Sequence, residues 1–84
     1  DLLTINGVEA SFVAVDNGAQ VSVSARSMGD VNVQVIMEKL GGGGHLTMAG
    51  AQLRNASLEE AKRRLLDAIS EYRESQRTEK QKNS

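Results

Sequence analysis

The sequence predicts an α/β domain: a small mixed β-sheet that includes a β-hairpin and packs against two helices. Three observations predict this class. Two runs of β-forming residues flank an Asn-Gly pair, an amphipathic segment with a helix start signal occupies the C-terminal part, and four consecutive glycines separate two apolar segments. The 84 residues leave room for one small core, so we expect a single domain.

A β-hairpin is predicted around Asn17-Gly18, because Asn-Gly between alternating apolar residues is the strongest short hairpin signal. If these two residues form the turn, Phe12 lies opposite Val23 on an apolar face. The same count places Glu9 opposite Arg26. In this register, three polar residues of the second strand lie on the other face: Ser22, Ser24 and Arg26.

The segment 31–40 fits two patterns, since its first half alternates like a strand while its apolar residues also match one face of a helix. The flanking residues favour the helix. Asp30 suits the N-cap, Lys39 suits the last turn, and Gly41 suits the left-handed position just past the end. We therefore expect a helix here, and a short third strand over 51–54.

The clearest helix begins after Ser57, which forms a capping box with Glu60. Its apolar stripe ends at Tyr72 and comprises Leu58, Ala61, Leu65, Ala68, Ile69 and Tyr72. Ion pairs are expected between residues four apart, Glu59 with Arg63 and Glu60 with Arg64. Because the stripe stops there, we expect a domain over 1–73 and a frayed polar tail over 74–84.

Charge and composition exclude some classes of function. The net charge of −1 is not that of a strongly basic protein held to duplex nucleic acid by its phosphates. Without cysteine the chain has no disulfide, thiolate metal site or Cys nucleophile. No apolar run reaches the roughly 20 residues of a membrane span, so a cytoplasmic setting is expected. The chain opens without Met, and we expect it to be part of a longer protein.

The four glycines before His45 are the main candidates for chemistry. Backbone N–H groups without neighbouring side chains converge readily on an anion such as phosphate. The expected donors are Gly42, Gly43 and Gly44, while Gly41 ends the preceding helix. His45 is expected to contact phosphate or base, and it is a poor metal ligand because no Cys or carboxylate stands beside it at ligand spacing. A flexible spacer is the alternative for this loop.

Short motifs follow one another in a characteristic order over residues 2–72: Ser24-Ala25-Arg26-Ser27, Gly29, Asn32-Val33, Ile36-Met37-Glu38, Gly41 to His45 and Ala49-Gly50-Ala51-Gln52. In this order they resemble the DHH-associated C-terminal domain of DHH phosphodiesterases, above all the bacterial membrane-anchored enzymes that hydrolyse cyclic di-AMP. The resemblance implies that a neighbouring DHH domain, absent from this chain, holds two manganese ions that activate water. It implies that this domain grips the substrate and has no catalytic or metal-binding residue of its own.

The resemblance implies substrate-binding roles for Arg26 and His45 beside the glycines. Arg26 offers a planar fork of donors to a phosphate, although a cross-strand pair with Glu9 would occupy it instead. Ser24 and Ser27 are further expected hydroxyl donors, and Asn32 either braces the loop or contacts the ligand. Both aromatic residues are assigned to the core, so base stacking on a ring is not expected.

The predicted function is substrate binding in a manganese-dependent phosphodiesterase that opens cyclic di-AMP to linear pApA. This chain alone is expected to be inactive and to hold no cofactor. Its expected partners are cyclic di-AMP or another phosphorylated dinucleotide, and the parent's DHH domain in cis; a homodimer of the parent stays open. The parent is expected at the cytoplasmic face of the bacterial membrane. Three alternatives remain: a substrate domain of RecJ-like nucleases or of nanoRNA and phosphoadenosine phosphatases, a non-catalytic RNA-binding module, and a structural domain whose loop is a hinge.

Overall fold

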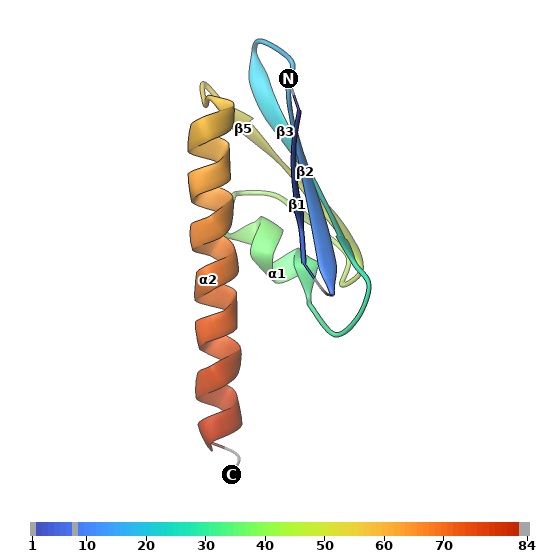
Figure 1. Cartoon of the computed structure of the whole chain (residues 1–84), viewed down its shortest axis with the longest axis vertical. Coiled ribbons are helices and arrows are strands. Elements are labelled where there is room, and N and C mark those ends of the chain that lie inside the picture. The colour runs from blue at the N-terminus through green and yellow to red at the C-terminus, as the bar shows by residue number, and fades with distance from the viewer. Residues whose placement is uncertain (1, 8, 83–84) are drawn as a thin grey trace.

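The computed structural model of the protein describes residues 2–7 and 9–82, with only the backbone for 79–82, and over these residues the chain forms five strands and two helices. Their order is β1 (Leu2–Asn6), β2 (Ala10–Asp16), β3 (Gln20–Ser27), α1 (Val33–Glu38), β4 (Gly43–Gly44), β5 (Met48–Arg54) and α2 (Leu58–Lys82). In Figure 1 both described helices lie on the same side of the sheet. The predicted class, a small sheet with a hairpin packed against two helices, is confirmed over this part of the chain.

The strand order in the sheet is β1-β2-β3-β5-β4. All pairings between the described strands are antiparallel, whereas the sequence predicts a mixed sheet. β5 begins at Met48, ahead of the strand predicted over 51–54. Neither edge strand, β1 or β4, is predicted from the sequence. β4 consists of two glycines, which local propensity disfavours in a strand.

The β2–β3 hairpin is confirmed, but its turn lies one residue further along the chain. The Asn17 N–H donates to the Gln20 carbonyl oxygen at 3.1 Å, so the two turn residues are Gly18 and Ala19. Gly18 has the positive φ of +98°. The Asn17 side chain closes the turn, because its Oδ1 accepts from the N–H groups of Ala19 and Gln20 at 3.2 and 3.0 Å.

With this turn, the observed register differs by two residues from the predicted one. Phe12 lies opposite Ala25, not opposite Val23 as predicted. Side chains alternate with a period of two along a strand, so a shift of two leaves each side chain on its predicted face. The predicted division of the hairpin into an apolar and a polar face is therefore confirmed.

Alternation divides the sheet into a buried face and an open face. The buried face packs against the helices and contributes Ala10, Phe12, Ala14, Val21, Val23, Ala25, Ala49, Ala51 and Leu53 to the core. The open face, on β2, β3 and β5, carries Ser11, Val13, Val15, Ser22, Ser24, Arg26, Met48, Gly50, Gln52 and Arg54. No described helix covers this second face (Figure 1). It is the side from which a ligand can approach the sheet.

Helix α1 is confirmed, but Asn32 and not Asp30 is its N-cap. The Asn32 Oδ1 accepts from the N–H groups of Gln34 and Val35 at 3.1 and 3.3 Å. Helix α2 fixes the start of α1 at this residue, because the Asn32 N–H donates to the Tyr72 hydroxyl at 2.9 Å. The predicted apolar face is buried and comprises Val33, Ile36, Met37 and Leu40.

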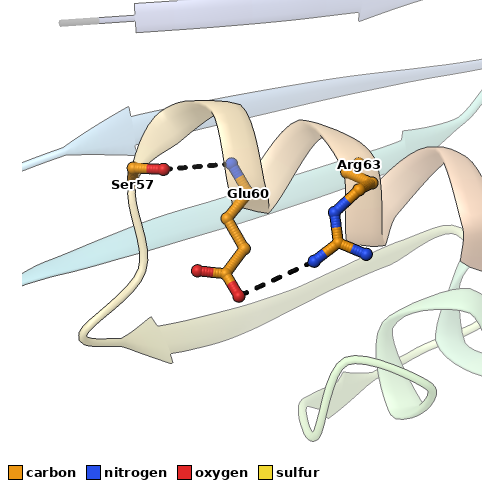
Figure 2. A network of polar contacts seen from close by, with 3 residues as sticks. All are labelled: Ser57, Glu60 and Arg63. Atoms are coloured by element: carbon orange, nitrogen blue, oxygen red, sulfur yellow. Dashed lines mark hydrogen bonds and ion pairs between the residues drawn. The ribbon is translucent and has the colours of Figure 1, made fainter.

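The start of α2 is confirmed at Ser57, although only half of the capping box forms. The Ser57 Oγ accepts from the Glu60 N–H at 3.1 Å. The Glu60 carboxylate turns to Arg63, 3.8 Å away, as Figure 2 shows. The ion pairs predicted four residues apart are therefore wrong for this structure, which pairs residues three apart. Both partners are largely exposed, so this pair contributes little to stability.

The predicted stripe of α2 is confirmed as its packing face, with Ala61, Leu65, Ala68 and Tyr72 buried in the core. Beyond Tyr72 the described side chains are exposed, but the backbone stays helical to Lys82 where the sequence predicts fraying. No Gly or Pro interrupts this stretch, and the Thr78 Oγ1 donates to the Glu74 carbonyl oxygen at 3.0 Å. Residues 83–84 of the predicted tail lie outside the described part. None of the described helices is both long and apolar enough to cross a membrane.

Candidate functional site

Arg26 stands on the open face near the end of β3, where the chain turns toward α1. Its cross-strand neighbours are Ser11 on β2 and Met48 on β5. The predicted pair with Glu9 is wrong: the shifted register places Met28 there, and the Met28 N–H donates to the Glu9 carbonyl oxygen at 2.7 Å. Within the described part of the chain, no carboxylate lies within ion-pairing distance of Arg26. The exposed guanidinium therefore keeps its fork of donors for a ligand.

Met48 of β5 lies between His45 and Arg26. The His45 N–H donates to the Met48 carbonyl oxygen at 2.7 Å, at the turn between β4 and β5. Pairing of β3 with β5 then brings both predicted residues to one end of the sheet, and both are exposed. A guanidinium and an imidazole in this arrangement are donors suited to a phosphate. No cluster of three or more His, Cys, Asp or Glu side chains able to hold a metal occurs among the described residues.

Gly42 does not offer its N–H group to a ligand, so the prediction of three backbone donors in a row is wrong at this residue. Its N–H donates to the Met37 carbonyl oxygen at 2.9 Å and closes the end of α1. Gly41 has φ +86°, as predicted for the residue past the helix end. The missing side chain at Gly42 serves packing, because a Cβ there would lie 2.7 Å from the Ala51 Cα.

Gly43 and Gly44 form the edge strand β4, paired with Gly50 and Ala49 of β5. Because the next residue, His45, bonds into the ladder through its N–H, alternation makes Gly44 and Ala49 a non-hydrogen-bonded pair. The Gly44 N–H then points away from β5 and stays a donor at the sheet edge, whereas Gly43 belongs to the ladder. The flexible-spacer alternative is wrong, because Gly41 and Gly42 close the end of α1 while Gly43 and Gly44 pair with β5.

Packing requires a glycine at position 44 but not at position 43. Gly44 has φ +148°, and a Cβ there would lie 2.5 Å from the Ala49 Cα and 2.6 Å from the Met48 carbonyl oxygen. A Cβ on Gly43 would meet none of the described atoms within 4 Å. The glycine run thus lets an edge strand approach β5 closely, a role that the sequence does not reveal.

Ser27 and Asn32 are not brought together with Arg26. Ser27 pairs with buried Ala10, so it belongs to the face opposite Arg26, and its hydroxyl donates to the Gly29 carbonyl oxygen at 3.1 Å. The Asn32 side chain caps α1 and so braces the helix, not the loop. Ser27 still supports the site through its backbone, since its N–H donates to the carbonyl oxygen of Thr47, in the turn after His45, at 2.9 Å.

A hollow of about 440 Å³ opens beside Arg26 on the open face. Its lining comprises Ser11, Val13, Ser24, Ala25, Arg26, Met48 and Ala49. Among those whose side chains lie on the open face, Ser11, Val13 and Met48 are absent from the sequence-based set of site residues. The alternation of β2 could have found the first two, because it places them on the same face as Ser24. Met48 carries no such signal, since its place depends on the pairing of β3 with β5.

The fold and the site together define a small α/β domain that presents an exposed Arg and a Gly-Gly-His edge segment on one side of its sheet. The chain belongs to the DHHA1 domain family, whose model matches residues 1–75. The resemblance stated from the sequence is therefore confirmed.

The relatives of the chain include cyclic dinucleotide phosphodiesterases. It is 60% identical over 72 residues to the cyclic-di-AMP phosphodiesterase GdpP of Geobacillus thermodenitrificans and 50% identical over 72 residues to the cyclic-di-AMP phosphodiesterase PdeA of Listeria monocytogenes. It is also 44% identical over 72 residues to the bifunctional oligoribonuclease and PAP phosphatase NrnA of Thermus thermophilus.

The chain spans a small part of these relatives. The alignments with the two phosphodiesterases cover 84% of this chain but 11% of each relative. The alignment with the oligoribonuclease covers 80% of this chain and 22% of that protein. Identity at this level assigns the family of the domain.

Proposed function

We propose that this domain binds cyclic di-AMP, or a similar phosphorylated dinucleotide, for a phosphodiesterase that opens it to linear pApA. The main support is the exposed Arg26 guanidinium with the exposed His45 on the other side of Met48, since the register brings both to one end of the sheet. The outward Gly44 N–H adds a backbone donor at the same end. The relatives named as cyclic-di-AMP phosphodiesterases support the choice of ligand.

The residues described here do not fit a manganese site. His45 is the single histidine of the sequence, and its neighbours Arg26 and Met48 supply a cation and a thioether. Manganese prefers carboxylate, carbonyl and water ligands. The proposal therefore assigns the two manganese ions to a DHH domain of the parent in cis, and it assigns no catalytic step to this chain. A parent anchored at the cytoplasmic face of the membrane belongs to the same proposal.

Binding by this domain alone is expected to be weak. Each charge-assisted hydrogen bond contributes about 1.5–3 kcal/mol, and Arg26, His45 and Gly44 supply two or three. Loss of translational and rotational freedom offsets part of this. A net binding free energy of about 4 kcal/mol corresponds to a millimolar dissociation constant. Full affinity then requires the second domain.

The test is an amide and side-chain NMR titration of the chain with cyclic di-AMP and with pApA. Saturable shifts are expected at Arg26, Gly44 and His45. Arg26→Gln is expected to weaken binding about tenfold, the loss of roughly 1.4 kcal/mol of charge-assisted bonding.

The matched control is Arg54→Gln, which removes the same charge from the same face. Arg54 lies opposite Gln20 and lines a neighbouring hollow of about 500 Å³, and it is roughly 20 Å from Arg26 along the strands. The Arg54→Gln variant is expected to leave the affinity for cyclic di-AMP unchanged. Equal losses in the two variants would indicate non-specific attraction to positive charge, and flat spectra at several millimolar ligand would contradict the proposal.

A second candidate is binding of a 5′-phosphorylated linear oligonucleotide, which the identity with the oligoribonuclease and PAP phosphatase favours. The same Arg26 and His45 would serve a terminal phosphate. The titration distinguishes the two candidate functions. Tighter binding of pApA than of cyclic di-AMP would favour the linear ligand, and the reverse order would favour the cyclic one.

A further inference from the structure

The hollow beside Arg26 contains groups that the proposed phosphate contacts leave unused. One cross-strand row of the open face has only small side chains or none: Val13, Ser24, Gly50 and Gly43. The two glycines lower the surface along this row. The next row toward the site is larger and consists of Ser11, Arg26 and Met48. Val13 and Ser24 of this small row line the hollow and form its floor, and the larger row is one of its walls.

The size of this floor suits a flat ring. Residues on one face of a strand recur every two positions, so neighbouring rows lie about 7 Å apart. The row on the other side of the floor consists of Val15, Ser22 and Gln52. The two bordering rows are thus roughly 13 Å apart. A planar group can lie between them against Val13 and Ser24.

Met48 provides the apolar wall of the hollow. Its side chain is 54% exposed, although its neighbour Ala49 is buried. A thioether is polarizable and makes favourable contacts with aromatic rings. The Arg26 plane beside it can stack on the same ring. The aromatic residues of the chain, Phe12 and Tyr72, are buried on the helix side, so Met48 and Arg26 are the groups placed to contact a ring.

Two hydroxyl groups in the hollow are available to a ligand. Among the described residues, the Ser22 hydroxyl donates to the Gln52 Oε1 at 2.7 Å, but no side-chain hydrogen bond takes the hydroxyls of Ser11 or Ser24. A serine hydroxyl both donates and accepts. These two can therefore match the donors and acceptors on the edge of a heterocycle.

We propose that this hollow binds the purine base of the nucleotide whose phosphate contacts Arg26 and His45. The proposal rests on the proposed function and deepens it. A purine covers more of the floor than a pyrimidine, because its fused rings reach from Met48 to Ser24. The hollow then distinguishes nucleotides by the base, while Arg26 and His45 bind the phosphate that all nucleotides share.

The test compares AMP with ribose 5-phosphate, using methionine methyl groups as NMR probes. The three methionines provide one probe and two controls. Met48 borders the hollow, Met28 is 61% exposed but does not line the hollow, and Met37 is fully buried. AMP is expected to shift the Met48 methyl and to leave Met28 and Met37 unmoved. Ribose 5-phosphate is expected to shift Arg26 but not the Met48 methyl. AMP should bind about fivefold more tightly, the scale of one thioether–ring contact.

The variants are Met48→Ala and, as the matched control, Met28→Ala. Met48→Ala is expected to lower the affinity for AMP toward that for ribose 5-phosphate and to leave the latter unchanged. Met28→Ala is expected to change neither. Both side chains are exposed, so loss of the fold is not expected in either variant.

The outcomes separate this inference from the proposed function. If ribose 5-phosphate shifts Arg26 but AMP binds no more tightly and leaves Met48 unmoved, the base site is refuted and phosphate binding stands. If CMP matches AMP in affinity and in the Met48 shift, the preference for a purine is refuted. If neither AMP nor ribose 5-phosphate shifts Arg26 or His45, the proposed function fails and the base site fails with it.

Discussion

Replacing Gly44 by Ala tests whether the glycine segment is a packed strand or a free anion-binding loop. In the structure Gly44 has φ +148°, and an added Cβ would lie 2.5 Å from the Ala49 Cα and 2.6 Å from the Met48 carbonyl oxygen. Alanine at this position must either adopt a rare backbone conformation or push β4 away from β5. In a free loop it would do neither. The variant therefore distinguishes the two descriptions by stability alone.

The magnitude follows from these two costs. A residue in a sparsely populated backbone region costs about 1–3 kcal/mol, and overpacking costs a further ~1–3 kcal/mol. One movement of β4 relieves both, so we expect the free energy of unfolding to fall by about 3 kcal/mol. A chain of this size is stable by roughly 4–12 kcal/mol. The expected fall in the melting temperature is about 12 °C or more.

The assay is urea unfolding followed by circular dichroism, with Gly43→Ala as the matched control. A Cβ on Gly43 meets none of the described atoms within 4 Å, and Gly43 is not among the glycines with positive φ. This control is expected to change the free energy of unfolding by less than about 0.5 kcal/mol. Equal losses at both positions, or no loss at Gly44, would refute the assignment of β4 as a strand packed on β5.

Two further predictions concern the start of α1. Asn32→Ala is expected to lower the free energy of unfolding by about 1 kcal/mol because it removes the N-cap, whereas Asp30→Ala should change it by less than about 0.5 kcal/mol; equal losses in urea unfolding would contradict the position of the cap. Tyr72→Phe removes the acceptor 2.9 Å from the Asn32 N–H and is expected to cost about 1 kcal/mol. It should also speed hydrogen exchange at the Asn32 amide, and an unchanged exchange rate there would show that this bond does not hold α1 to α2.

The hairpin shows how much of the fold local pattern can predict. Alternation assigns the side chains of β2 and β3 to the correct faces even though the predicted turn is one residue off, because a register error of two preserves the faces. The same error produced the predicted pairing of Glu9 with Arg26, whose neighbour on β2 is in fact Ser11. A sequence can thus predict which side of a strand is buried more securely than which residue lies opposite.

The helices show the same limit. The apolar stripe of α2 is correct because packing repeats with the helical period, and four of its residues are buried. The predicted N-cap of α1, Asp30, is wrong because both Asp30 and Asn32 have side chains that can cap a helix. The choice between them depends on Tyr72, which is remote in the chain but adjacent in space.

By itself the sequence determined the class of fold, the buried faces of β2, β3, α1 and α2, and the two residues, Arg26 and His45, on which the proposed site depends. Only the tertiary structure decided that Met48 lies between them and that Gly43 and Gly44 form an edge strand. The physical reason is that side-chain periodicity is local, whereas the pairing of strands distant in sequence is set by packing of the whole chain. Every backbone N–H is chemically alike, so which glycine donors remain for a ligand depends on which carbonyl groups the fold brings within reach.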